Sequence, residues 1–343
     1  MKNTASVAAA RRGAGIGARQ NSGGGRSGQW GAGRRFLLLL PALLLPALLL
    51  TALLLPAFLL TAPPVLAQDD DADAVGRGAY LFAAAGCAGC HTDVENDGPP
   101  LAGGRALETP FGIFYSPNIT PDPDTGIGDW TEADFLRALR DGKAPDGSTY
   151  FPVFPYTSFT LMADADIADM WAYLRSVDPV SRENRAHEAA FPFGWRGLLP
   201  IWQWLHLEPG PMAPDQGAAI ARGAYLVNAL GHCGECHTPR GAMGALDRDR
   251  WLAGTDEGPE GGKIPNITPD PETGIGAWSD DEILRVLESG MLPDFDVVGG
   301  GMAEVVRNST SKLTDEDRVA IVAYLRSLPA IGNEDAAATQ PEY

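Results

Sequence analysis

The pattern of apolar and polar positions divides the chain of 343 residues into an apolar leader and a longer part with helical patterning. Residues 36–67 carry no charge and are mostly leucine, whereas apolar and polar positions are interspersed in the rest of the chain. There, helices are predicted to begin after the N-caps Thr131 and Ser279 and to end at Gly142 and Gly290. No strictly alternating run predicts a sheet, so we expect an all-α fold with long loops between helices.

The leader has the order of a secretory signal. Residues 1–35 contain seven basic groups and no acidic one, the charge-free run follows, and small residues at 65–67 offer a cleavage site. The pattern predicts a signal peptide over residues 1–67, cleaved after Ala67. The alternative is a retained anchor, because the charge-free run is long enough to span a bilayer and would associate the protein with the membrane. Either way, we expect residues 68–343 in the periplasm.

The part after the leader contains an internal repeat. The segment 117–128 recurs almost unchanged as 265–276, and the sequences around both segments match in the same order. This recurrence indicates a duplicated domain. We expect domains at 72–180 and 217–331, joined by an aromatic and proline-rich connector at 181–216 and followed by a loose tail at 332–343. Because the connector is aromatic rather than polar, we expect it to pack across both domains.

The charge of the chain excludes one class of partner. The formal net charge is −18, and residues 68–343 alone hold 19 basic and 44 acidic groups, a balance of −25. A phosphate backbone requires a basic face, so nucleic-acid binding is not expected. The acidic surface instead predicts salt-dependent docking to basic patches on protein partners.

The four cysteines form two C-x-x-C-H patterns. They read Cys87, Cys90 and His91 in the first copy, and Cys233, Cys236 and His237 in the second. This is the pattern of covalent c-type haem attachment, in which two thiols bind the porphyrin and the histidine binds the iron. Two haem c groups are therefore predicted. A thioredoxin-like redox pair and a shared zinc site are the alternatives, but neither requires a histidine at the same place in each repeat.

A haem iron that only carries electrons needs a sixth ligand, usually Met or His. In the second copy Met302 follows three glycines, in a loop expected before the last helix, and is the predicted ligand. In the first copy Met162 is the nearest methionine to the corresponding loop, although it aligns with a hydrophobic position before the last helix. If the first iron lacks methionine, His187 and His206 in the connector are the alternatives.

The sequence resembles class I cytochromes c, twice over. The segment 98–103 is similar to the stretch that follows the haem motif in that family. The resemblance implies that the Pro99 carbonyl accepts a hydrogen bond from His91 and that Leu101 packs on the ring. It also implies two tandem domains, each with a few helices wrapped round a covalent haem.

More narrowly, the chain resembles diheme cytochromes related to the cytochrome c subunits of membrane-bound alcohol and gluconate dehydrogenases. The likeness covers about 75–330 and rests on the duplicated loops and on the segments 154–159 and 302–308. Those subunits carry three haem motifs and often have Met where this chain has Phe154. The resemblance implies a periplasmic relay from a dehydrogenase to a terminal oxidase or a quinone-linked acceptor.

Two classes of function follow. The first is an electron carrier. Such a protein has no catalytic residues, and we do not expect it to be an enzyme itself. The alternative is a protein with one open haem, either a diheme peroxidase or a gas sensor. A peroxidase also requires a distal acid or base, and nothing in the sequence singles one out.

Overall fold

The computed structural model describes residues 67–212, 218–258 and 261–336. The predicted signal peptide therefore lies outside the described residues apart from Ala67, as do residues 337–343 of the tail. Among the helices of the described residues, none combines the length and apolar character that a membrane span requires.

The first copy of the repeat begins and ends with long helices that cross each other. Its helices and turns are α2 (Ala67–Ala84), α3 (Cys87–His91), η1 (Val94–Asn96), α4 (Glu132–Asp141), α5 (Tyr156–Phe159) and α6 (Asp164–Ser176). Buried Gly78 of α2 lies at the crossing with α6, where a Cβ atom would come within 1.9 Å of the Asp169 carbonyl oxygen. Only glycine allows the two backbones to approach this closely.

The second copy repeats this arrangement. Its helices and turns are α8 (Ala218–Tyr225), the π-helical η3 (Leu226–Leu230), α9 (Gly234–His237), η4 (Arg248–Arg250), α10 (Asp280–Ser289), α11 (Gly300–Asn308), η5 (Thr310–Lys312), α12 (Asp315–Ser327) and η6 (Glu334–Ala336). Gly223 of α8 lies against the Ala320 carbonyl oxygen of α12, and a Cβ atom there would again come within 1.9 Å. The repeated glycine is thus explained by one helix crossing made twice.

The predicted caps of α4 and α10 are present. The Ser279 hydroxyl accepts a hydrogen bond from the Glu282 amide, and the Glu282 carboxylate accepts one from the Ser279 amide, which makes a capping box. Thr131 makes the same arrangement at the start of α4. The helices end at left-handed glycines, with φ of 58° at Gly142 and 78° at Gly290.

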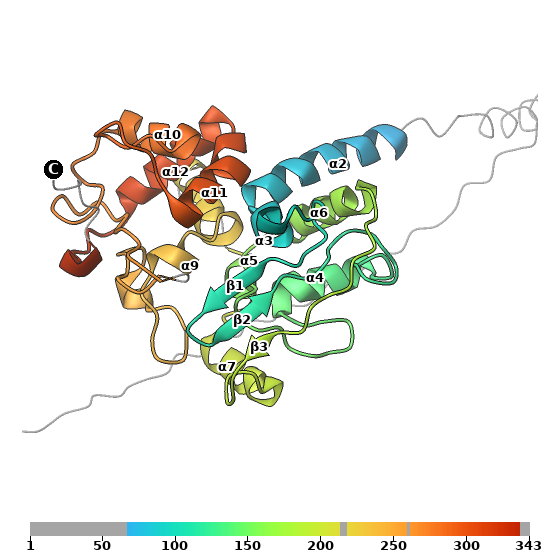
Figure 1. Cartoon of the computed structure of the whole chain (residues 1–343). Coiled ribbons are helices and arrows are strands. Elements are labelled where there is room, and N and C mark those ends of the chain that lie inside the picture. The colour runs from blue at the N-terminus through green and yellow to red at the C-terminus, as the bar shows by residue number, and fades with distance from the viewer. Residues whose placement is uncertain (1–66, 213–217, 259–260, 337–343) are drawn as a thin grey trace, which may run out of the picture. The chain divides into compact units, whose positions relative to one another are not determined.

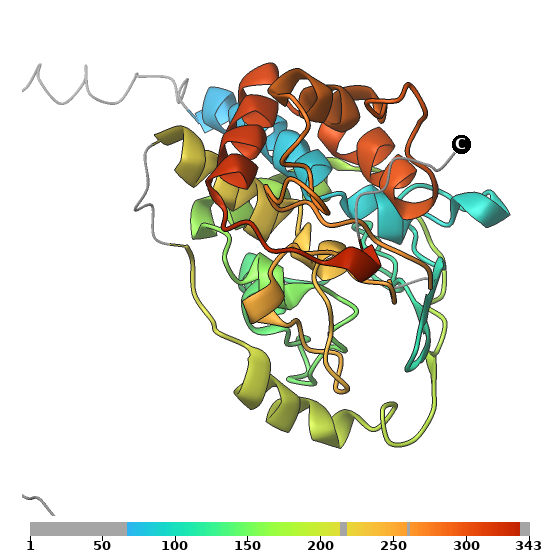
Figure 2. The same cartoon turned by 90° about the vertical axis from the view of Figure 1, so that its left-hand side faces the viewer.

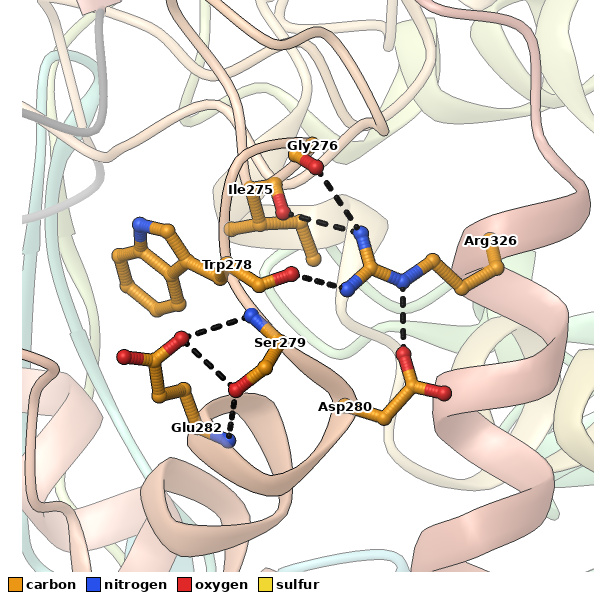
Figure 3. A network of polar contacts seen from close by, with 7 residues as sticks. All are labelled: Ile275, Gly276, Trp278, Ser279, Asp280, Glu282 and Arg326. Carbon is orange, nitrogen blue, oxygen red and sulfur yellow. Dashed lines mark hydrogen bonds and ion pairs between the residues drawn. The ribbon is translucent and has the colours of Figure 1, made fainter.

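A basic side chain of the last helix binds both the duplicated loop and the start of α10. Figure 3 shows the Arg326 guanidinium of α12 bonded to the carbonyl oxygens of Ile275, Gly276 and Trp278 and to the Asp280 carboxylate. The loop, the start of α10 and the end of α12 are therefore held by one side chain.

The expectation of an all-α fold is wrong in one region. A three-stranded antiparallel sheet is formed by β1 (Ala106–Thr109), β2 (Gly112–Tyr115) and β3 (Glu188–Ala189). Strands of two to four residues are too short to show an alternating pattern, and β3 comes from the connector, far along the chain. Sequence periodicity therefore could not reveal this sheet.

The connector lies on the sheet and on both copies. After β3 it forms η2 (Arg196–Leu198) and α7 (Leu199–His206). The side-chain amide of Gln203 donates to the Asp141 carbonyl oxygen of the first copy at 2.9 Å. The Trp202 indole donates to the Met243 carbonyl oxygen of the second copy, also at 2.9 Å. The expected packing across both copies is thus observed.

The two copies share one hydrophobic core. A single cluster of buried side chains includes Met162 and Leu174 from the first copy and Val227 and Leu325 from the second. The described residues accordingly form one compact unit. Figures 1 and 2 show α2 beside α6, and α7 at the edge of the fold remote from α2 and α12.

The contacts between the copies are reciprocal. Tyr80 donates to the Asp317 carboxylate at 2.6 Å, and Tyr225 donates to the Asp166 carboxylate at 2.6 Å. Tyr80 and Tyr225 occupy equivalent positions in the two copies, as do Asp166 and Asp317. Each copy therefore contributes a tyrosine from its first helix to the last helix of the other.

Candidate functional site

Each C-x-x-C-H pattern lies on a short helix directly after a long one. In the first copy Gly86, with φ of 63°, turns the chain from α2 into α3. In the second, His232, with φ of 38°, makes the turn from η3 toward α9. Cysteines three positions apart on one helical turn project from the same face, so each pair is arranged to hold one group.

The motif histidines are oriented by carbonyl oxygens of the duplicated loops. His91 Nδ1 lies 2.8 Å from the Pro117 oxygen, and His237 Nδ1 lies 2.7 Å from the Pro265 oxygen. Because a carbonyl only accepts, Nδ1 carries the proton in both rings and Nε2 keeps its lone pair. Burial lowers the pKa of both histidines, although the hydrogen bonds oppose this shift. The neutral tautomer suited to binding iron is therefore favoured.

The expectation that Pro99 accepts from His91 is wrong. The single Nδ1 proton of His91 is donated to the Pro117 oxygen, while the Pro99 carbonyl closes its own turn by accepting from the Ala102 amide at 3.2 Å. The prolines that open the duplicated loops perform this role in both copies. The repeat could have revealed them, because it is the same proline in each loop.

Leu101 anchors the loop that follows the first haem motif. It is buried with φ of 60°, its amide donates to the Thr92 hydroxyl at 3.1 Å, and its carbonyl accepts from the Ile119 amide at 2.9 Å. Leu252 has the same left-handed backbone, with φ of 59°, in the second copy. The packing of Leu101 on the haem ring stays a prediction.

The duplicated loops are built around a buried asparagine. The side-chain amide nitrogen of Asn118 donates to the Thr125 hydroxyl at 3.0 Å and to the Val180 carbonyl oxygen at 2.7 Å. Its side-chain oxygen accepts from the backbone amide of Thr120 at 2.9 Å. The same pattern of bonds surrounds Asn266 in the second copy. The loops are therefore rigid where they present their proline carbonyls to the histidines.

The acidic side chains of these loops form turns. The Asp122 carboxylate accepts from the amide and the hydroxyl of Thr125, both at 2.8 Å, and these bonds lower its pKa. Among the described residues, no group of three or more His, Cys, Asp or Glu side chains is placed to hold a metal ion by itself.

The cysteines do not have the character of a thiol–disulfide pair. Burial, with a smaller contribution from the neighbouring cysteine, raises the pKa of Cys87 and of Cys233 to about 12. A redox-active pair needs a thiol whose pKa is lowered toward neutrality. The environment of both sites opposes thiolate chemistry.

Met302 lies in a helix and not in a loop, which corrects that part of the prediction. It is half-buried in the first turn of α11, whose N-cap is Gly299 and whose first two residues are Gly300 and Gly301. Its role as the sixth ligand of the second iron stays a prediction. Helix α11 packs against α3, the helix of the first haem motif.

Met162 is fully buried in the shared core, just before α6. Leu313 occupies the equivalent position before α12 and belongs to the same core cluster. Phe154 packs on the Phe159 ring with a centroid distance of 5.7 Å. Ligation of the first iron by Met162 stays a prediction.

The alternative histidine ligands lie in the connector. The Tyr115 amide donates to His187 Nδ1 at 3.2 Å, which holds this ring beside the sheet. His206 ends α7 and packs on the Trp202 ring with a centroid distance of 5.1 Å. Both side chains are thus engaged with the first copy or the connector.

Each haem motif is connected to the segment before the other copy's last helix, the second motif directly and the first through Arg105. The Glu235 carboxylate, inside the second motif, accepts from the hydroxyls of Thr157 and Ser158 of α5, both at 3.0 Å. Arg105 donates to the Gly89 carbonyl oxygen inside the first motif at 2.7 Å and pairs with Glu304 of α11. Both motifs therefore lie at the junction between the copies.

Comparison with known proteins identifies the family. The cytochrome c family matches the chain twice, at residues 75–178 and 220–329. The chain belongs to the cytochrome c family. A cytochrome named diheme cytochrome c-type, from Cereibacter sphaeroides, is 49% identical over 264 residues, which are 74% of this chain and 86% of that protein.

Other related cytochromes are subunits of dehydrogenases. The cytochrome c subunit of the quinone alcohol dehydrogenase of Gluconobacter oxydans is 40% identical over 280 residues, 77% of this chain and 57% of that subunit. The cytochrome c subunit of the gluconate 2-dehydrogenase of Pantoea cypripedii is 40% identical over 291 residues, 80% of this chain and 63% of that subunit. The chain thus spans less than two thirds of each of these subunits.

The residues of both sites fit a covalent haem. In each copy two thiols share one face of a helical turn, and the next residue is a histidine whose Nδ1 proton is fixed and whose Nε2 is available. The protein carries two covalently bound haem c groups. Attachment through the two cysteine pairs and ligation of the irons by His91 and His237 stay predictions, which the geometry of both sites fits. When bound, the haem iron supplies one-electron chemistry by changing between its ferric and ferrous states.

Proposed function

We propose that this cytochrome is an exported electron carrier, which accepts electrons from a dehydrogenase and passes them to a respiratory acceptor in the periplasm. The acceptor is a terminal oxidase or a quinone-linked protein. The proposal is supported by relatives named as cytochrome subunits of dehydrogenases and by the signal-like order of residues 1–67. Its direct role is electron transfer, and the oxidation of substrate belongs to the partner.

The observation that carries the proposal is the position of both haem motifs at the junction between the copies. Helix α11 packs against α3, and α5 packs against η3 beside the second motif. Two haems attached here are held by one rigid core, so an electron can pass between them without rearrangement of the chain. The proline carbonyls hold the protons of His91 and His237 at Nδ1. Electron transfer moves no proton in this scheme, so it requires no acid or base.

Met302 is the proposed sixth ligand of the second iron, and Met162 that of the first. A methionine ligand closes the iron to small molecules and favours simple electron transfer.

The second candidate function, a peroxidase or gas sensor with one open haem, is favoured by Phe154. A phenylalanine has no atom that ligates iron, and its ring packs on neighbouring aromatic rings. If Met162 stays in the core, the first iron keeps a position at which a small molecule can bind.

Carbon monoxide titration of the reduced, haem-loaded protein distinguishes these functions. Two six-coordinate irons bind no carbon monoxide, which is the expected result. One equivalent per chain assigns an open site, and turnover of hydrogen peroxide then separates a peroxidase from a sensor. Reduction of the oxidised protein by a dehydrogenase and its substrate tests the carrier role itself. The rate of this reduction should fall as salt is added, because salt screens the attraction between acidic and basic surfaces.

A further inference from the structure

The connector exposes an apolar surface that the fold itself does not use. Of the fourteen large hydrophobic side chains that are exposed among the described residues, half lie within residues 191–205. We call these seven the connector patch: Phe191, Phe193, Trp195, Leu198, Ile201, Trp204 and Leu205. Concentrations of this kind mark interaction sites, whereas single exposed apolar residues do not.

The inner face of the connector is firmly attached. Leu199 is buried in a cluster with Phe114 and Phe151, and the Arg196 guanidinium donates to the Thr149 carbonyl oxygen at 2.8 Å. Together with the bonds of α7 to both copies, these contacts hold the helix in place. The outer face of α7 is therefore presented on a rigid support, and Trp204 is 82% exposed there.

The charge around the connector patch indicates its partner. Residues 189–207 contain no acidic side chain, although residues 68–343 carry a net charge of −25. Exposed Glu188 and Glu208 border this stretch in the sequence, and the Glu188 carboxylate also lies 3.8 Å from the Arg185 guanidinium. An apolar centre with an acidic rim is complementary to an apolar face ringed by basic side chains.

The same charges disfavour the other occupants of an apolar face. A helix that lies on a membrane carries Lys and Arg beside its apolar face, and this stretch has only Arg196, which is already bonded to the first copy. A second copy of the chain would bring two acidic rims together. A protein of opposite charge is thus favoured over both lipid and self-association.

We propose that the connector patch is the docking surface for the electron-donating subunit, a protein with an apolar, basic-rimmed face. Permanent subunit interfaces are rich in aromatic residues, as this patch is. Trp202 ties α7 to Met243, six residues after His237, so a donor bound here lies beside the segment that follows the second haem motif. The inference rests on the proposed function.

Photocrosslinking of the full, haem-loaded chain in its source organism tests the contact. Phe191 and Phe295 are matched probes, because they are 84% and 81% exposed and only the first lies in the patch. Each is replaced by p-benzoylphenylalanine. We expect the probe at Phe191, and not the one at Phe295, to capture a dehydrogenase. When supplied with its substrate, the captured protein should reduce this cytochrome. Capture of a second copy, capture of lipid alone, equal capture by both probes or no capture would overturn the proposal.

A kinetic comparison separates failure of docking from failure of the proposed function. Trp204→Ser should raise the KM of the dehydrogenase for the cytochrome at least ~10-fold, as expected for an aromatic residue central to an interface, whereas Phe295→Ser should leave it unchanged. If both variants are reduced like the wild type, the docking surface is elsewhere and the carrier role stands. If no dehydrogenase of the organism reduces even the wild type, the proposed function itself is refuted.

Discussion

The helix crossing at Gly78 offers a sharp test of the packing described here. In Gly78→Ala the new Cβ atom would lie 1.9 Å from the Asp169 carbonyl oxygen, so α2 and α6 would have to separate by about 1.1 Å to restore 3.0 Å. The obstructing atom belongs to the backbone and cannot rotate away. Overpacking of this kind costs roughly 1–3 kcal/mol or more, against a gain of about 1 kcal/mol from the helix propensity of alanine. We expect a net loss of about 2 kcal/mol.

Gly76→Ala is the matched control. Gly76 lies two residues earlier in α2 and is exposed, and a Cβ atom added there would meet no other atom within 4 Å. At this position the propensity gain acts alone, so the free energy of unfolding should rise by about 0.5–1 kcal/mol. Guanidinium unfolding of the haem-loaded proteins, followed by far-UV circular dichroism, measures both changes. If Gly78→Ala were as stable as Gly76→Ala, the close crossing of α2 and α6 would be refuted.

Three further predictions concern the second copy. Asn266→Ala leaves the buried Thr268 amide without its acceptor and removes one of the two donors to the Ile331 carbonyl oxygen, and it should lower the free energy of unfolding by about 3 kcal/mol in the same assay. Burial opposes ionisation of Asp317, but bonds from Arg222 and a tyrosine outweigh it and lower its pKa, so its contribution is present above about pH 4 and is lost as pH falls through that lowered pKa. Acid unfolding should therefore be steeper in the wild type than in Asp317→Asn, and equal slopes would contradict this. Met302→Leu should bind one more equivalent of carbon monoxide than the wild type, and unchanged binding would show that another group ligates the second iron.

Local signals in the sequence were sufficient for much of the fold. The caps at Thr131 and Ser279 and the terminal glycines of α4 and α10 depend on neighbours within a few residues, so their chemistry is readable from the chain. The haem motifs are equally local, because a cysteine pair and its histidine fit on one helical turn. The recurrence of the loop at 117–128 indicated that the chain contains a duplicated domain.

Features that depend on distant partners were missed or misplaced. The acceptor for His91 is Pro117, 26 residues away, and its identity depends on how the duplicated loop folds back on the motif. Strand β3 pairs with β2 only after the connector has returned to the first copy. For Met302, the preceding glycines predicted a loop, but packing of α11 against η5 and α3 outweighs their low helix propensity.

The reciprocal tyrosine–aspartate contacts have an evolutionary and kinetic consequence. Tyr80 with Asp317, and Tyr225 with Asp166, are the paired contacts of an isologous interface, which two identical chains make about a two-fold axis. The tandem protein thus has the architecture of a homodimer whose subunits have been fused. Fusion replaces the encounter of two separate chains with a permanent contact, so the proposed transfer between the haems should be independent of protein concentration. The outer surface, including the connector, is then free to diverge toward different partners.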